Sequence, residues 1–219
     1  MKIEYLGHSC FKLTESTGTT VITDPYSAEI GIKLPKGLKA DAVTISHDHY
    51  DHNNLKAVDG TPTVIRKEGF YELPGVEITA IKSYHDTEEG ALRGENVIFK
   101  FRMDGMDVCH LGDLGEECSA ELIEMLLPIN ILLIPVGGTY TLDAEQAKEY
   151  VDRIMPDIVI PMHYRSKHVD IDLDRAQGFL DAFEDEDVSV CGENVLEFTR
   201  EDLTEEQTKI ILMERTKTK

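Results

Sequence analysis

Three of the eight histidines in this 219-residue chain fall within six positions, in the run His47-Asp48-His49-Tyr50-Asp51-His52. Imidazole nitrogens and a carboxylate oxygen are the ligands that a borderline metal such as Zn²⁺ takes in an open, catalytic site. In extended backbone the side chains at i and i+2 point the same way, so His47 and His49 can converge on one point. Asp51 and His52 are directed to a neighbouring point where the chain turns. The run therefore offers ligands for two adjacent metals, and a chance cluster in an exposed turn is the alternative.

The elements that must position this run are a predicted strand at residues 42–45 and a predicted helix at residues 53–58. Three more residues of ligand type lie just beyond predicted strands: His85 after 76–81, Asp113 after 106–111 and His163 after 157–161. In α/β proteins the ends of several strands gather at one edge of a sheet, where sites tend to lie. Together with His47, His49, Asp51 and His52 these make seven residues of ligand type. They would bind two metals if one carboxylate bridges the metals, and Asp113 is the natural bridge.

The chemistry follows from the charge of the metals. A metal-bound water can have its pKa lowered to about 7, which supplies hydroxide at neutral pH, and two metals can polarise a carbonyl or phosphoryl oxygen. Asp24 ends a predicted strand at residues 21–23, and from there it would fix the tautomer and orientation of a ligand histidine. A simple turn at Asp24-Pro25 is an equally good interpretation.

The remaining pattern predicts a hairpin of residues 96–101 and 106–111 that turns at Asp104-Gly105. Helices are expected at residues 119–127, after Asp143 with Gln146 completing a capping box, and at 172–183. A second capping box at residues 204–207 predicts a C-terminal helix within 200–219, which could pack on the body or on another subunit, so a homo-oligomer stays open. Residues 41–47 and 157–163 share an Asp, an apolar run and a terminal His, as a duplicated sheet-and-helix sandwich would, although chance could also produce this. No linker divides the chain, so we expect a single domain over residues 1–219.

Composition restricts the class of protein. Apolar residues make up 41% of the chain and charged residues 29%, which is typical of a soluble globular protein. No apolar stretch is long enough to span a membrane, and the first residues are not expected to form a signal peptide. The net charge of −20 disfavours binding to nucleic acid or to anionic membranes. The four cysteines lack CxxC spacing, which suits reduced thiols in the cytoplasm.

The run from His47 to His52 matches the HxHxDH signature of the metallo-β-lactamase fold hydrolases, and His85, Asp113 and His163 follow in that family's order. Four further motifs resemble the branch that includes L-ascorbate-6-phosphate lactonase: Gly7-His8-Ser9, Thr23-Asp24-Pro25, His110-Leu111-Gly112-Asp113 and Pro161-Met162-His163-Tyr164. The resemblance covers about residues 1–198, which is nearly the whole chain.

This resemblance implies an α/β architecture, an αββα sandwich of two mixed sheets flanked by helices, with a dinuclear site at one edge. The ligands that it implies are His47, His49 and His85 for the first metal, Asp51, His52 and His163 for the second, and Asp113 as the bridge. Zn²⁺ is usual in the family, and Mn²⁺ or Fe also occur. His49 stands where the di-iron redox branch has Glu, which favours hydrolysis over reduction of O₂ or NO.

Further residues near these motifs have more than one possible role. His8 would act with Asp51 and Asp113 as a catalytic residue, by donating a proton or contacting the substrate, or it is a hydrogen-bonded structural histidine. His110 alternates with its strand and is expected to be packed rather than to bind metal. The residues that follow His163 would contact the substrate or support the ligands, or form a solvated basic loop; they are Tyr164, Arg165, Lys167 and His168.

The predicted function is a metal-dependent hydrolase in which hydroxide activated by two metals opens an ester-like bond, in a lactone or a phosphorylated small molecule. The alternatives are a phosphodiesterase acting on RNA or a phospholipid, and a metal-binding scaffold without turnover. The charge of −20 argues against RNA. Retention of all seven ligand-type residues argues against a scaffold that has lost its activity. We therefore expect a small-molecule substrate that carries negative charge, with no nucleic-acid or membrane partner.

Overall fold

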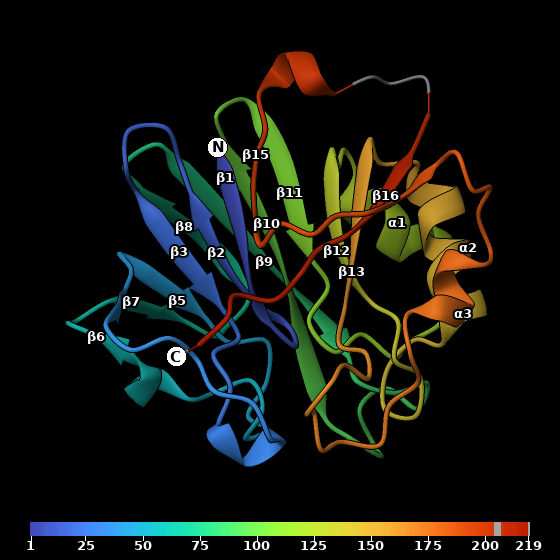
Figure 1. The fold of residues 1–219 in the computed structure, drawn as a ribbon, viewed down its shortest axis with the longest axis horizontal. Coiled ribbons are helices and arrows are strands. Elements are labelled where there is room, and N and C mark those ends of the chain that lie inside the picture. The colour runs from blue at the N-terminus through green and yellow to red at the C-terminus, as the bar shows by residue number, and fades with distance from the viewer. Residues whose placement is uncertain (204–206, 219) are drawn as a thin grey trace.

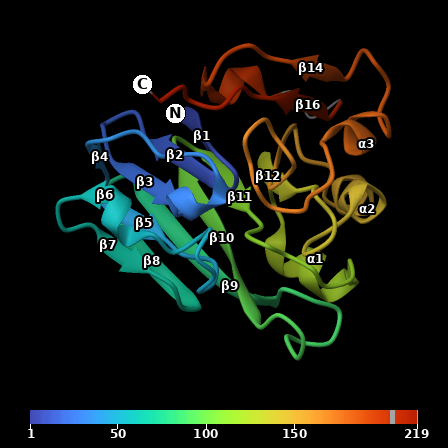
Figure 2. The ribbon, with the colours of Figure 1, turned by 60° about the horizontal axis from the view of Figure 1, so that its bottom comes forward.

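The computed structural model describes residues 1–203 and 207–218. Two β-sheets pack face to face, and the helices lie on the outer face of one of them (Figures 1 and 2). Both sheets mix parallel and antiparallel strands, which confirms the predicted sandwich of two mixed sheets. Among the described residues, no helix has the length and apolar character needed to cross a bilayer.

The first sheet has six strands in the order β15-β1-β2-β3-β5-β7. Strands β3, β5 and β7 run parallel, while β15, β1 and β2 add antiparallel neighbours. The bounds are β1 Lys2–Gly7, β2 Cys10–Thr14, β3 Thr20–Thr23, β5 Ala42–Thr44, β7 Thr63–Ile65 and β15 Val195–Glu197. A separate parallel pair joins β4 Leu38–Lys39 to β6 Val58–Asp59.

The second sheet has eight strands in the order β14-β16-β13-β12-β11-β10-β9-β8. Its bounds are β8 Gly69–Leu73, β9 Val76–Tyr84, β10 Glu95–Met103, β11 Met106–His110, β12 Ile131–Pro135, β13 Ile158–Met162, β14 Val188–Val190 and β16 Lys209–Leu212. The predicted hairpin between β10 and β11 is confirmed. Asp104 and Gly105 at its tip have positive φ angles of 52° and 71°, which suit a tight two-residue turn.

The helices are α1 Ala120–Leu126, α2 Ala144–Ile154 and α3 Gln177–Leu180, with 3₁₀ turns η1 Ala28–Ile30, η2 Leu55–Ala57 and η3 Arg200–Asp202. The predicted capping box is present: the side chain of Asp143 accepts from the backbone of Gln146 at 2.9 Å, and the Gln146 side chain accepts from the backbone of Asp143. One apolar cluster fills the space between the sheets, and a second lies between the eight-stranded sheet and the helices. A third covers the outer face of the first sheet, where η1, η2 and loops replace a layer of helices.

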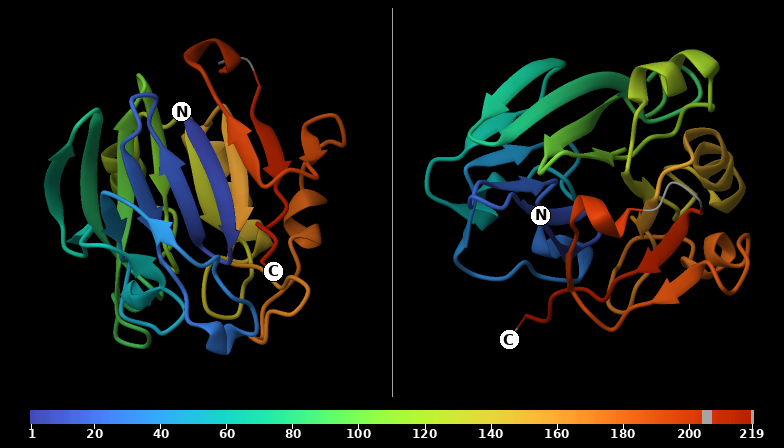
Figure 3. Two further views of the ribbon diagram at one scale, coloured as in Figure 1. Left: turned by 60° about the vertical axis from the view of Figure 1, so that its left-hand side comes forward. Right: turned by 90° about the horizontal axis from the view of Figure 1, so that it is seen from above.

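Three helix predictions are wrong. Residues 53–58 form only the 3₁₀ turn η2, and residues 172–183 contain only the four-residue α3. The reason in the second case is tertiary: the N–H of Asp174 donates to the carbonyl of Gly137 and its carbonyl accepts from Arg165. The predicted C-terminal helix is a strand, β16, which pairs with β13 and β14; residues 204–206 of its capping box lie outside the described residues. Past β16 the chain crosses to the first sheet, where the N–H of Thr216 donates to Tyr5 (Figure 3).

The strands that carry the predicted ligands end at the same edge of the sandwich. In the second sheet β11, β12 and β13 run parallel, and β9 has the same direction because it and β11 both run antiparallel to β10. The loop after β5 is tied to that edge by the N–H of Val97, which donates to the carbonyl of Ser46 at 2.9 Å. The N–H of His163 donates to the carbonyl of His8, which joins the sheets a second time. The fold therefore gathers side chains from both sheets at one edge.

Candidate metal centre

The structure brings all seven predicted ligand residues together and adds His8. Their ligand atoms form three overlapping groups, within each of which the atoms lie within 4.8 Å of one another. The groups are His8, Asp51, His52 and His163; His47, His49 and His85; and His47, His52 and Asp113. Residues more than 100 positions apart in the sequence thus meet in one cluster, which we call the metal cluster.

Asp113 lies at the centre of this cluster. Its Oδ2 is 3.2 Å from the Nε2 atoms of both His52 and His163, 3.3 Å from that of His85 and 3.7 Å from that of His47. Burial alone would raise the pKa of Asp113, but His163 and His52 hold it well below its usual range. Asn96 accepts from the N–H of Asp113 at 3.0 Å, so the backbone of this residue is held as well. One carboxylate oxygen therefore faces imidazoles from both sheets.

Asp51 and His8 form one side of the metal cluster. The Oδ2 of Asp51 is 3.0 Å from the Nε2 of His8 and 3.4 Å from that of His52. Burial opposes ionisation, yet contacts with His163, His52 and His8 lower the pKa of Asp51. Burial and the neighbouring His163 lower the pKa of His8 to about 4. His8 is thus neutral at neutral pH and holds a carboxylate that stays charged.

His47, His49 and His85 form the other side of the metal cluster. The Nε2 of His47 lies 2.9 Å from the Nδ1 of His49, and burial lowers the pKa of His47 to about 3. Burial and the neighbouring His85 also lower the pKa of His49, although its side chain is exposed. Neutral imidazoles keep a free lone pair, which metal binding requires.

The donor atoms fit a divalent metal ion. Within the described residues, the Nε2 atoms of His52 and His163 and the Oδ1 of Asp113 are buried and have no hydrogen-bond partner. Leaving a buried polar group unpaired costs about 1–3 kcal/mol, so three such atoms on these three residues are unfavourable in the absence of a ligand. Coordination by a cation satisfies imidazole and carboxylate lone pairs together.

Asp24 and Ser46 fix two of the imidazoles from behind. The Oδ2 of Asp24 accepts from the Ser46 hydroxyl at 2.6 Å and from the Nδ1 of His52 at 2.9 Å. Because the Ser46 proton is used in this way, its oxygen accepts from the Nδ1 of His47 at 2.9 Å. Both rings therefore donate from Nδ1 and direct their Nε2 atoms into the metal cluster. Ser46 was not predicted as a site residue, and its position directly before His47 is the one signal that the sequence offers.

Backbone strain accompanies these side chains. His8, Asp24 and His163 have φ angles of 56°, 38° and 50°, a region that non-glycine residues seldom adopt. Such strain collects at functional sites, where the surrounding structure enforces it. A side chain at Gly112, directly before Asp113, would force its neighbours to shift, because a Cβ there would lie 2.4 Å from the Oδ1 of Asn96.

The other predicted residues lie elsewhere. The ring of His110 spans Ser9 and Gly112 through hydrogen bonds of 2.8 and 3.1 Å, so it is packed, as predicted, and lies outside the metal cluster. Tyr164, Arg165 and Lys167 line a separate cavity of about 630 Å³ together with Arg175. The exposed His168 does not line the cavity at the metal cluster, and neither do Tyr164 and Arg165. The structure therefore does not bring this basic group to the cluster.

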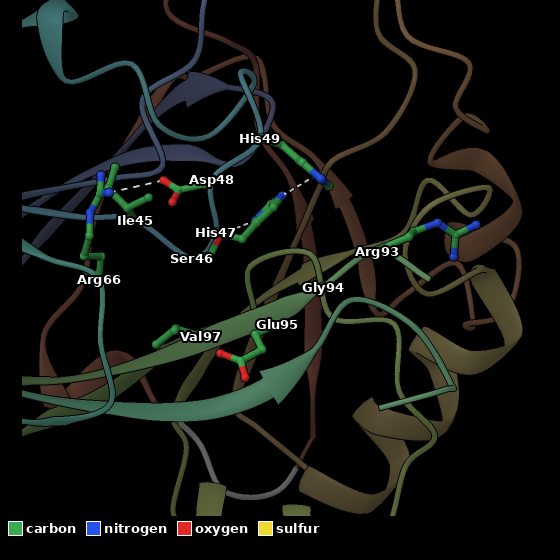
Figure 4. Close-up of a pocket in the computed structure, with 10 residues that line it drawn as sticks. All are labelled: Ile45, Ser46, His47, Asp48, His49, Arg66, Arg93, Gly94, Glu95 and Val97. Atoms are coloured by element: carbon green, nitrogen blue, oxygen red, sulfur yellow. Dashed lines mark hydrogen bonds and ion pairs between the residues drawn. The ribbon is translucent and has the colours of Figure 1, made fainter. Parts of the chain in front are cut away.

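Two cavities open beside the metal cluster. One of about 410 Å³ is lined by His49, Tyr50, Asp51, His85, Leu92, Arg93, Asp113, Tyr140, His163 and Ile171. The other, of about 380 Å³, is lined by Ile45, Ser46, His47, Asp48, His49, Arg66, Arg93, Gly94, Glu95 and Val97 (Figure 4). Five of these residues lie in or beside loops that show no periodic pattern, so the sequence did not indicate them: Arg66, Leu92, Arg93, Tyr140 and Ile171.

Comparison with known proteins places this geometry in a family. The model of the beta-lactamase superfamily domain matches residues 2–163. A UPF0173 metal-dependent hydrolase of Methanoregula boonei is 32% identical over 190 residues, which cover 76% of this chain and 83% of the relative. A UPF0173 metal-dependent hydrolase of Thermococcus onnurineus is 27% identical over 193 residues, which cover 76% of this chain and 85% of the relative. A crystal structure from Thermotoga maritima, described as a candidate Zn-dependent hydrolase of the metallo-β-lactamase superfamily, is 36% identical, with a TM-score of 0.80 and coverage of 98% and 99%. The metallo hydrolase Igni18 of Ignicoccus hospitalis is 26% identical, with a TM-score of 0.61 and coverage of 83% and 91%.

Proposed function

This chain belongs to the metallo-β-lactamase superfamily of metal-dependent hydrolases, and on that premise we propose that it hydrolyses an ester-like bond in a small molecule at a centre of two divalent metals. The observation that carries the proposal is the position of Asp113, whose Oδ2 is surrounded by the imidazoles of His47, His52, His85 and His163. A carboxylate placed between two sets of imidazoles is suited to bridge two cations. A lactone or a phosphorylated small molecule is the proposed substrate, as in the lactonase branch that the sequence resembles.

The side chains divide into two sets around Asp113. His47, His49 and His85 would hold one ion, and Asp51, His52 and His163 the other. The predominance of imidazole favours Zn²⁺, with Mn²⁺ or Fe as the alternatives. When bound, the metals would supply hydroxide near neutral pH and positive charge for a developing oxyanion.

The chain's own groups keep these ligands ready. Asp24 and Ser46 accept the Nδ1 protons of His52 and His47, so the Nε2 atoms of both rings are directed at the cluster. His8 donates from Nε2 to Asp51 at 3.0 Å and thereby orients that carboxylate. The rings of Tyr50 and Tyr140 and the side chain of Ile171 give the cavity an apolar side for the acyl part of a substrate.

The four free cysteines support the proposal that the protein is cytoplasmic. The net charge of −20 supports the proposal that it binds neither nucleic acid nor a membrane.

The test is the substitution Asp113→Ala, assayed on a panel of lactones, phosphomonoesters and phosphodiesters after metal loading. We expect turnover to fall by about 100-fold or more, because the carboxylate that would hold both metals is removed. Asp107→Asn is the matched control, since Asp107 is a buried carboxylate at the other end of β11. A chelator should abolish turnover and added metal should restore it. Undiminished turnover in Asp113→Ala would contradict the proposal, and turnover of phosphodiesters alone would replace the lactonase assignment.

A further inference from the structure

The two cavities beside the metal cluster share the side chains of His49 and Arg93. Figure 4 shows Arg66 and Arg93 at opposite ends of one cavity, with His47 and His49 between them. Arg93 lines the other cavity together with the proposed ligands His85, Asp113 and His163. A molecule whose reacting bond lies at the metal cluster would therefore occupy a cavity that Arg93 helps to line.

The loop between β9 and β10 holds Arg93 in place. The carboxylate of Asp86, directly after His85, accepts from four backbone N–H groups, those of Glu88, Gly90, Leu92 and Arg93, at 2.6 to 3.0 Å. Beyond the backbone, the Nη2 of Arg93 donates to the carbonyl of Thr139 at 3.0 Å, and its guanidinium lies 5.8 Å from the centre of the Tyr140 ring. The loop and the side chain are thus ordered before any ligand arrives.

The guanidinium of Arg93 has no carboxylate partner among the described residues, although the chain carries 42 acidic residues against 22 basic ones. Arg66, at the other end of the cavity, pairs with Asp48 at 3.2 Å. A guanidinium offers five N–H donors in a planar fork that matches carboxylate and phosphate oxygens. With one of them used on Thr139, Arg93 keeps donors for an anion from solution.

Large apolar side chains stand around the same cavity. Tyr50, Leu92 and Tyr140 are 49%, 70% and 40% exposed, and each of them lines the cavity that contains Arg93. Exposed apolar groups gathered at one opening indicate a binding surface. The combination of one unpaired cation with an apolar wall matches an organic anion, whose charged group and hydrocarbon part need different surroundings.

We propose that Arg93 binds the negatively charged group of the substrate, and that the substrate is a small organic anion whose apolar part packs on Tyr50, Leu92 and Tyr140. The inference rests on the proposed function, since it assigns a substrate class to the same site. It replaces the basic residues after His163 as the anion-binding group, because Arg165 and Lys167 line a different cavity. Arg93 is a specificity-determining residue that does not take part in bond cleavage.

The kinetic test compares two esters of similar size in metal-loaded protein: mono-4-nitrophenyl succinate, which is anionic, and 4-nitrophenyl butyrate, which is neutral. In Arg93→Ala we expect the KM for the anionic ester to rise about tenfold or more, as for a lost hydrogen bond to a charged group, while the KM for the neutral ester and both kcat values stay within about twofold. Arg93→Lys should recover part of the affinity, because it keeps the charge and loses the fork. Arg165→Ala is the matched control and should change neither KM.

A binding measurement separates this inference from the proposed function. Calorimetric titration with 4-phenylbutyrate and with phenylphosphonate, a phosphate analogue whose P–C bond is not hydrolysed, should show about tenfold weaker binding in Arg93→Ala and none of that loss in Arg165→Ala. The two ligands distinguish a carboxylate from a phosphate as the preferred group. If no ester is turned over but both ligands depend on Arg93, the hydrolytic function is wrong and the anion site stands. If Arg93→Ala binds both ligands as the parent does, or if only Arg165→Ala weakens them, the inference is wrong.

Discussion

Asp113 and Glu116 are separated by two residues, yet their surroundings shift the pKa of the two carboxyl groups in opposite directions. Asp113 is surrounded by imidazoles, and its pKa is held well below the usual range although burial opposes this. Glu116 lies in a cleft with Glu117, Glu149 and other residues beside α2, and burial raises its pKa to about 7. Burial raises the pKa of both carboxyl groups, although Glu116 is only partly buried, and only Asp113 has imidazoles that reverse the effect. A cluster of acids without such donors does not make a metal site.

The largest effect should follow the loss of a carboxylate from the metal cluster. Asp51→Ala removes the oxygen that faces His8, His52 and His163, so we expect about 100-fold or more loss of metal-dependent turnover and less bound metal per chain. Glu117→Ala, in the acidic cleft, is the control and should retain both. Metal content measured after gel filtration, together with kinetics, checks the pair. Equal metal content in the two variants would remove the distinction drawn between these regions.

A smaller effect is expected where a carboxylate supports the ligands without facing the cavity. In Asp24→Asn the residue keeps its size but loses the charge that receives the Nδ1 proton of His52 and the Ser46 hydroxyl. Supporting partners of this kind are worth about 10- to 100-fold in metal affinity. Competition with a fluorescent chelator gives the affinity directly. An unchanged dissociation constant would mean that Asp24 serves only the turn it makes with Pro25.

Asp86 is a third carboxylate with little exposure to solvent, and its hydrogen-bond donors are backbone N–H groups where Asp113 faces imidazoles. Asp86→Ala leaves the four N–H groups of its loop without their acceptor, so we expect a melting temperature lower by about 3 °C and a higher KM for anionic esters, with the KM for neutral esters little changed. Thermal unfolding and the ester pair measure both effects. A rise in KM that is equal for the two esters would show a general distortion of the cavity and no specific displacement of Arg93.

The sequence was sufficient to predict which residues gather in the metal cluster, because each of the seven lies in a motif or just past a strand with a clear apolar pattern. His85, Asp113 and His163 follow β9, β11 and β13, as expected. The residues that complete the cavity could not be predicted in this way. Arg93 and Tyr140 lie in loops, and their positions depend on Asp86 and on the carbonyl of Thr139, which are tertiary contacts without a local pattern.

The errors in the fold have the same origin. The C-terminal residues have a capping-box sequence, but Ile210 and Ile211 are β-branched and pair with β13 and β14, which lie far from one another in the sequence. Propensity is a weak guide where a sheet edge is open to a further strand. The helix expected over residues 172–183 failed because the backbone of Asp174 is used by Gly137 and Arg165. In α2 the local pattern was sufficient, because both hydrogen bonds of its capping box form.

The smallest predicted effect tests the acidic side of the comparison. The pKa of Glu116 is about 7 in the folded protein against an ordinary value of 4.5, so the folded state binds the proton more tightly than the unfolded chain. Its contribution to stability is therefore complete below about pH 4.5 and is lost as the pH rises through about 7. Glu116→Gln cannot lose a proton, so it should match the parent near pH 4.5 and exceed it by about 1 kcal/mol above pH 7, a modest value because the side chain is partly exposed to solvent. Urea unfolding at both pH values measures this, and Glu117→Gln controls for the removal of one negative charge. A difference that does not change with pH would mean that Glu116 has donors as effective as those around Asp113, and the contrast between the two regions would then lie elsewhere.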